Sequence, residues 1–136
     1  MNFELTRAGI ASYFFDNWDQ GDLPVVAENQ PAPNTNGIAW GRFSVLFGQG
    51  DPLALGDQSV RVNGMAVLQV IIPEGAGTAA ATAAGGAFAT LMNRRQLILS
   101  STVTASFQAV GMVDAGGREG YVQKNFSVQF RADTLG

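Results

Sequence analysis

Residues 61–95 have the sequence RVNGMAVLQVIIPEGAGTAAATAAGGAFATLMNRR, and this stretch decides the fold. Its first part has the period of a strand, because every second residue from 66 to 72 is apolar, while Asn63 and Gln69 interrupt the opposite face. Pro73 and Gly75 then favour a turn. Thr78 is a suitable N-cap for a helix that we expect to continue to about residue 95. The stretch therefore predicts a long strand at 61–72, a turn and a helix.

The predicted helix carries no charged residue before Arg94. One stripe of it is apolar and should pack on a sheet, whereas the opposite flank has only small neutral residues, which allow another surface to approach closely. Gly85 and Gly86 should each cost about 1 kcal/mol relative to Ala, which is reasonable where a backbone packs closely. An ordinary alanine-rich exposed helix is the alternative. The stripe consists of Ala81, Ala84, Phe88, Leu91 and Met92, and the flank of Ala79, Thr82, Ala83, Gly86 and Thr90.

The remaining elements follow from the same two periodicities. A first helix is predicted at 3–18, and further strands at 25–29, 38–47, 102–113 and 121–131, with a frayed tail after them. The loops are expected at 30–37, 48–59 and 114–118. We therefore expect one α+β domain over residues 1–136, in which a mostly antiparallel β-sheet is covered on one face by two helices. The apolar stripe of the first helix is Ala8, Ala11, Phe14, Phe15 and Trp18.

The chain is poor in charge for its size. Only 14% of its 136 residues are charged, against about 25% in a typical soluble domain. Much of the surface must therefore be neutral or covered by something else. The predicted loop at 48–59 is one candidate for a covered surface, because it carries Leu53 and Leu55 among its turn-forming residues.

The composition excludes several functions. Cysteine and histidine are both absent, which rules out disulfides, Ser-His and Cys-His catalysis and nearly all zinc chemistry. A net charge of −3 has the wrong sign for a protein that grips a phosphate backbone. We expect no signal peptide at the first residues and no membrane span, since the longest weakly apolar tract is broken by Pro73 and Glu74.

The strongest motif match is Gly75–Ala80, which fits the dinucleotide-binding pattern G-x-G-x-x-A between a strand and a helix. A dinucleotide site needs an acidic partner for the ribose about 20 residues further on. No acidic residue lies between Glu74 and Asp114, and Glu74 itself would repel a pyrophosphate. The motif therefore favours a plain strand-to-helix turn.

Three other features also have simple structural explanations. The acidic cluster at 16–22 lacks the spacing of a calcium loop and fits a solvated helix end, with a weak cation site or an acidic contact surface as alternatives. Lys124 is the single lysine and fits a solvated or interface position better than a Ser-Lys pair. Trp40 beside Arg42 indicates packing, because no basic and aromatic stripe surrounds them. No catalytic residue, metal ligand or cofactor is predicted.

Local strings of sequence accompany this order of elements: VAEN at 26–29, AWGRF at 39–43, VRVNG at 60–64 and, above all, VIIPEGAGT at 70–78. With the aromatic first helix, they resemble the tail terminator-like proteins of long-tailed bacteriophages over nearly the whole chain. The resemblance implies a small α/β subunit that forms a hexameric ring on the last ring of the tail tube. Such a ring stops tube polymerisation and offers the surface on which the head connector docks. The resemblance also implies a protein that is not an enzyme.

The neutral surfaces agree with this implication, because neighbours in a ring would cover them. The partners implied are further copies of the chain, the tail tube protein and the head-completion or connector protein, while DNA passes through the channel without specific binding. The place implied is the head-proximal end of the virion tail, after synthesis in the host cytoplasm. The alternatives are another ring subunit of the neck or tube, and a small ligand- or nucleotide-binding module. The interface residues we predict are Asp51, Leu53, Leu55, Asp57, Thr82, Gly86, Gln123 and Asn125.

Overall fold

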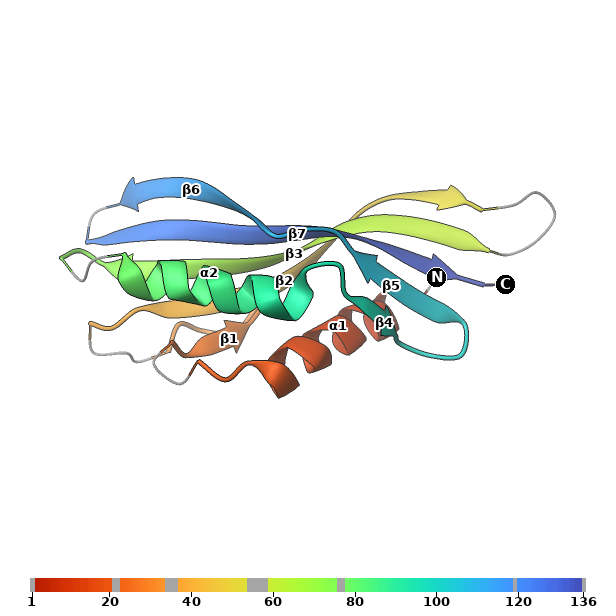
Figure 1. Ribbon diagram of the computed structural model, residues 1–136, viewed down its shortest axis with the longest axis horizontal. Helices are drawn as coiled ribbons and strands as arrows, with labels where there is room; N and C mark the ends of the chain where they lie inside the picture. The colour runs from red at the N-terminus through yellow and green to blue at the C-terminus, as the bar shows by residue number, and fades with distance from the viewer. Residues whose placement is uncertain are drawn as a thin grey trace.

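The computed structural model describes residues 2–20, 23–33, 37–53, 59–75, 78–118 and 120–135. In this part of the chain the helices and strands follow the expected order, with one additional short strand, β4, after the second helix (Figure 1). The elements are α1 (Phe3–Asn17), β1 (Val25–Ala27), β2 (Trp40–Pro52), β3 (Val60–Pro73), α2 (Ala79–Met92), β4 (Gln96–Ile98), β5 (Val103–Phe107), β6 (Gly111–Arg118) and β7 (Tyr121–Thr134).

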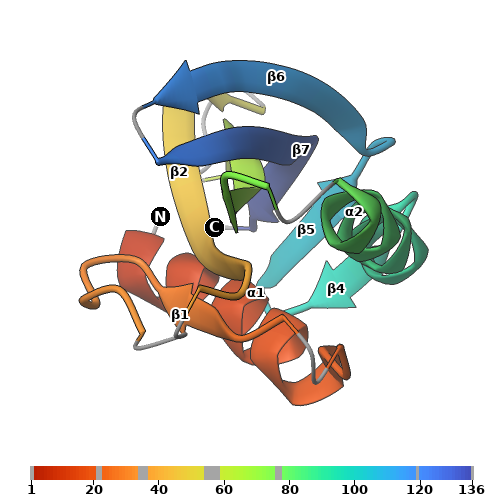
Figure 2. The ribbon, with the colours of Figure 1, turned by 90° about the vertical axis from the view of Figure 1, so that its left-hand side faces the viewer.

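The strands form one strongly curled sheet, which Figure 2 shows along its length. Their order is β1-β2-β3-β7-β5-β4, and β6 also pairs with β7. The pairing is antiparallel throughout except between β1 and β2, which are parallel. The first half of β7 pairs with β6 and its last part with β5, so that one long strand holds both. The expected α+β fold with a mostly antiparallel sheet is confirmed.

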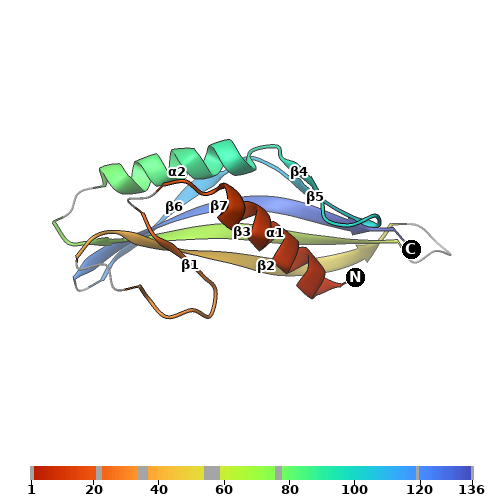
Figure 3. The ribbon, with the colours of Figure 1, turned by 90° about the horizontal axis from the view of Figure 1, so that it is seen from below.

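Both helices lie on the same face of the sheet, as expected (Figures 2 and 3). Aromatic rings of both helices pack on the sheet and hold the helices in this position. Phe14 of α1 stacks on Phe43 of β2, with ring centroids 4.2 Å apart and planes 3° from parallel. Phe88 of α2 meets the same Phe43 ring edge-on, with centroids 6.3 Å apart. The core therefore lies between the sheet and the two helices, and the opposite sheet face carries no helix in the part of the chain described here.

The buried row of α1 differs in part from the expected stripe. The row consists of Thr6, Ile10 and Phe14, which follow one another at intervals of four residues, whereas Phe15 is 37% exposed. Thr6 can be buried because its hydroxyl donates a hydrogen bond to the backbone oxygen of Asn2 (3.1 Å). The prediction was wrong for Phe15, because two neighbouring phenylalanines fit the helical period almost equally well, whereas Ala11 and Trp18 pack against the core as expected.

The packing of α2 confirms the expected stripe, because Ala81, Ala84, Phe88 and Met92 are buried. Gly85 is buried with them, and a Cβ atom there would lie 2.2 Å from Cε1 of Phe126. The expected close approach is therefore real at Gly85. Nothing lies within 4 Å of a Cβ at the neighbouring Gly86, so the explanation fails there.

The hairpin between β2 and β3 is longer than predicted. Instead of ending at Phe47, β2 continues to Pro52, and Gly50–Pro52 pair with Val60–Val62. The register shifts between Phe47 and Gly50, which is a β-bulge. The turn-forming residues at the start of the predicted loop, Gly48, Gly50 and Pro52, therefore belong to strand β2. The rest of that loop, residues 54–58, lies outside the described residues.

The strand predicted at 102–113 is interrupted. Its two parts, β5 and β6, are separated where the chain passes the end of α2: the backbone oxygen of Gln108 accepts a hydrogen bond from the Arg94 amide (2.8 Å), and Asn93 Oδ1 accepts one from the Val110 amide (2.7 Å). The predicted end of α2 at residue 95 is also wrong, because α2 ends at Met92 and Arg94 has a left-handed backbone (φ 53°).

Two ends of elements were also placed wrongly. The predicted loop at 114–118 is strand, since β6 continues to Arg118. The tail expected to fray from residue 133 instead belongs to β7 through Thr134, which pairs with both Val60 and Val103. A paired neighbour on each side holds this end of the chain in the sheet.

Candidate assembly surfaces

The helix-free face of the sheet is formed by alternate residues of β2, β3 and β7, and most of them are uncharged. Gln123 and Asn125 are half-buried on this face, and Gln123 Nε2 donates a hydrogen bond to Asn125 Oδ1 (3.0 Å). They lie in register with Ile71 and Gln69 of β3. The predicted interface residues of β7 thus belong to one continuous polar row on the side of the sheet away from the helices.

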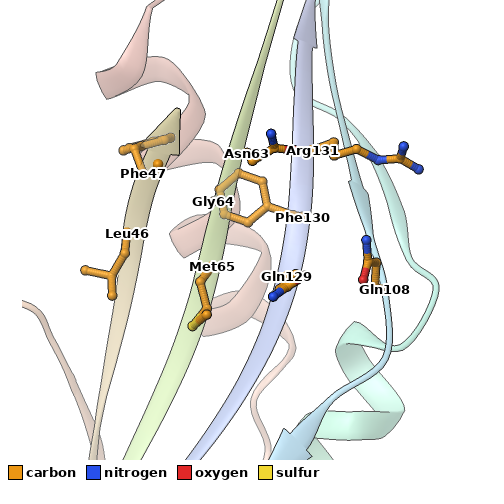
Figure 4. Close-up of a pocket in the computed structure, with 10 residues that line it drawn as sticks. Leu46, Phe47, Asn63, Gly64, Met65, Gln108, Gln129, Phe130 and Arg131 are labelled. Carbon is orange, nitrogen blue, oxygen red and sulfur yellow. The ribbon is translucent and has the colours of Figure 1, made fainter. Parts of the chain in front are cut away.

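A shallow depression of about 370 Å³ lies across this face (Figure 4). Its apolar side chains come from β2, β3 and β7, and its polar ones from β3, β7 and the bend before β6. Charge enters it only through Arg131, and no carboxylate lines it. Such a lining can hold a side chain of another protein but offers no pair of acid and base groups for catalysis. The lining residues are Leu46, Phe47, Gly48, Asn63, Gly64, Met65, Gln108, Gln129, Phe130 and Arg131.

An ion pair connects β3 to β7 near the far end of the same face. The Arg61 guanidinium donates through Nε and Nη2 to the two carboxylate oxygens of Asp133, at 2.7 and 2.9 Å. This hydrogen bonding holds the pKa of Asp133 below its usual value and raises the pKa of Arg61. Asp51 of β2 lies in register with Arg61 and is exposed, so the predicted contact residue is next to a charge pair that is already satisfied.

The outer flank of α2 is exposed along its length and carries no charge. Thr82 and Gly86 both lie on it, as predicted. The Thr82 hydroxyl donates to the backbone oxygen of Thr78 (3.1 Å), and the Thr90 hydroxyl to that of Gly86 (3.1 Å). Because the helix itself satisfies these hydroxyls, the flank presents mainly methyl groups and backbone to its surroundings. The exposed residues of the flank are Ala79, Ala80, Thr82, Ala83, Gly86 and Thr90.

The described end of the β2–β3 hairpin carries another predicted residue, Leu53. Leu53 is exposed, and its amide donates to the backbone oxygen of Ser59 (2.9 Å). Leu55 and Asp57 lie outside the described residues. The predicted interface residues therefore do not form one patch. They lie at the hairpin end, on the α2 flank and on the helix-free face, and the last two look in opposite directions.

The other candidate features show no arrangement typical of catalysis. The Arg42 guanidinium lies 5.2 Å from the Trp40 ring centroid and donates to the backbone oxygen of Gln30 (2.9 Å), as expected for packing. Gly75 has a φ of +87°, which suits a turn. Within the described ranges, no group of acidic residues is arranged to hold a metal ion. None of the helices described has the length and apolar character needed to cross a membrane.

An α+β fold with extended uncharged surfaces is typical of a structural subunit, which acts by contact with other chains. The comparisons agree. The family model described as phage tail terminator protein matches residues 6–130, so the chain belongs to the phage tail terminator family and is a structural protein of a phage tail. The resemblance noted in the sequence is confirmed.

One solved structure has the same fold at a TM-score of 0.74 and 18% identity, and the match covers 97% of this chain and 96% of that one. It is among eight chains of solved structures that match. At this identity the likeness concerns the fold alone. No curated protein matches the chain.

Proposed function

We propose that the protein forms a six-membered ring at the head-proximal end of the tail tube. There it stops tube polymerisation and presents the surface on which the head connector docks. The match to the tail terminator family over residues 6–130 carries this proposal. Its partners are further copies of itself, the tail tube protein and a head-completion or connector protein.

The uncharged surfaces support a ring. A ring at the end of a tube makes contacts between its own subunits and contacts with the rings above and below it. The α2 flank with Thr82 and Gly86 and the helix-free face with Gln123 and Asn125 lie on opposite sides of the subunit and expose few charges. Such surfaces lose little solvation when a neighbour covers them. The hairpin end with Leu53 extends away from both and is free to contact the tube or the connector (Figure 1).

The net charge suits a channel for DNA. Six subunits at −3 each carry about −18 in total. A ring of this charge repels phosphate groups, so DNA passes through it without specific binding.

The mass of the protein in solution tests the ring. We expect native mass spectrometry to give a species of about 86 kDa, six times the 14.3 kDa of one chain, either for the protein alone or after addition of tail tubes. A protein that stays monomeric in both conditions contradicts the proposal. Imaging of the assembled neck then separates a terminator from another neck or tube ring, because these differ in their position in the particle.

A charge at the hairpin end tests that contact separately. We expect Leu53→Asp to leave the free energy of unfolding within about 0.5 kcal/mol of wild type, since the side chain is exposed. The same variant should block joining of tails to heads, because a carboxylate is costly to bury in a contact. Leu53→Met, which keeps an apolar side chain, is the matched control and should assemble normally. Full assembly of the Asp variant would exclude Leu53 from the contact.

A further inference from the structure

Two strand segments of the curled sheet have an edge without a partner strand. In the described part of the chain, β6 pairs only with β7, and the half of β2 beyond Phe43 pairs only with β3. The other edge strands, β1 and β4, are only three residues long each. Unpaired amide and carbonyl groups along an edge are a template on which another strand can add.

The start of the β6 edge is apolar. Met112 and Val113 are the last residues of the apolar run AVGMV at 109–113, and Asp114 follows them. Met112 is 55% exposed and Val113 is 61% exposed. Met112 lies in register with Phe126, which faces the helices, and Val113 in register with Asn125, which faces away from them. The edge thus exposes one apolar side chain on each face of the sheet.

The free edge of β2 has the same character. Glu28 Oε1 accepts a hydrogen bond from the Val45 amide (3.3 Å), so the edge becomes free from Leu46 onward. Leu46, on the helix-free face, is 52% exposed. On the helix face, Phe47 meets the 50% exposed Phe3 with ring centroids 5.0 Å apart. This edge also exposes apolar side chains on both faces.

The two edges match each other face by face. If β6 of one copy adds beside β2 of another, the sheet continues from copy to copy, Val113 meets Leu46 on one face, and Met112 meets the Phe3 and Phe47 rings on the other. We infer that neighbours in the ring join by this pairing, in which β6 of one copy lies beside β2 of the next copy of the same chain. The inference rests on the proposed ring, because a ring contact joins two different patches of identical subunits.

The first residues of β6 carry no side chain that protects an edge from pairing. Residues 111–113 include no Lys, no Pro and no charged residue, and the first charge is that of Asp114. A register shift in each strand, after Phe47 in β2 and after Asp114 in β6, limits the length that can pair. A short contact of this kind adds one strand pair at each junction and leaves the rest of the sheet unchanged.

Disulfide trapping tests the pairing cleanly, because the chain has no cysteine. The double variant Leu46→Cys with Val113→Cys is oxidised with copper phenanthroline, and Leu46→Cys with Gly111→Cys covers a register two residues away on the same face. Strands β3 and β7 lie between the two positions within one chain, a separation of about 14 Å along the sheet. A disulfide needs Cα atoms within about 7 Å, and a disulfide within one chain would leave a monomer on a denaturing gel, so every larger product joins different copies. We expect a denaturing gel to show a ladder up to the number of subunits in the ring.

Three controls make the result decisive. Val113→Cys alone should give no covalent product, and dimers from it would overturn the inference in favour of β6 pairing with β6. A ladder from Ile98→Cys with Val113→Cys, which places the second cysteine on the exposed β4 edge, would also overturn it. The inference would also be overturned if the two double-cysteine variants that join β2 to β6 gave covalent dimers but nothing larger. Native mass on the same samples separates the two proposals: intact rings without disulfides contradict only the strand pairing, whereas a missing ring contradicts the proposed function.

Discussion

We expect Phe14→Ala to lower the free energy of unfolding by about 3–5 kcal/mol, the range for removing a buried aromatic ring. Phe14 is fully buried, and its ring stacks on Phe43 of β2 at 4.2 Å and on Trp18 at 5.1 Å. It also meets Phe88 of α2 edge-on at 6.0 Å. One side chain thus contacts α1, the sheet and α2, so its loss leaves a cavity where all three meet. Urea unfolding, with the oligomeric state held constant, measures the change.

The neighbouring residue gives the control. Phe15 is 37% exposed and touches Phe14 and Phe43 only edge-on. We expect Phe15→Ala to cost less than Phe14→Ala, about 1–2 kcal/mol, because more than a third of the residue already faces water. Equal losses from the two variants would contradict the position of α1 on the sheet.

The second large effect is expected at Gly85. A Cβ atom there would lie 2.2 Å from Cε1 and 2.6 Å from Cζ of the buried Phe126 ring. Gly85→Ala therefore forces α2 away from the sheet, at a cost of about 1–3 kcal/mol for overpacking. This loss should outweigh the gain of about 1 kcal/mol that alanine brings to a helix. The midpoint of urea unfolding should fall while its slope stays unchanged.

Gly86 is the matched control on the same helix. Nothing lies within 4 Å of a Cβ at this position, and the residue is exposed. Gly86→Ala should therefore stabilise the subunit by up to about 1 kcal/mol through helix propensity alone. Opposite signs for two adjacent glycines test the packing of α2 directly. If both variants are stabilised, α2 does not lie against Phe126.

The elements with a clear period could be predicted from the sequence. The alternation of β3 and the apolar stripe of α2 extend over many residues, and both elements lie close to their expected ranges. The three residues of β4 are too few for a period to appear, and only Leu97 among them is half-buried. The bulge in β2 could not be predicted either, because the glycines that form it are also turn formers.

The sequence could indicate which residues lie on uncharged surfaces, but not how these surfaces are arranged around the subunit. The absence of charge on α2 and the polar residues of β7 are properties of sequence, and they led to Thr82, Gly86, Gln123 and Asn125. The free edges of β6 and β2 were missed. The apolar run at 109–113 was a signal for them, but an apolar run does not tell whether a strand lies inside a sheet or at its edge.

The sequence by itself determined the order of the two helices and the long strands, the lack of His and Cys chemistry and the neutrality of the surface, because these depend on residue identity and local period. The tertiary structure alone decided which of Phe14 and Phe15 is buried, why Gly85 must lack a side chain, and that the predicted contact residues lie on opposite sides of the sheet. The physical reason is that burial and facing are set by strand register and helix packing, which join residues far apart in the chain.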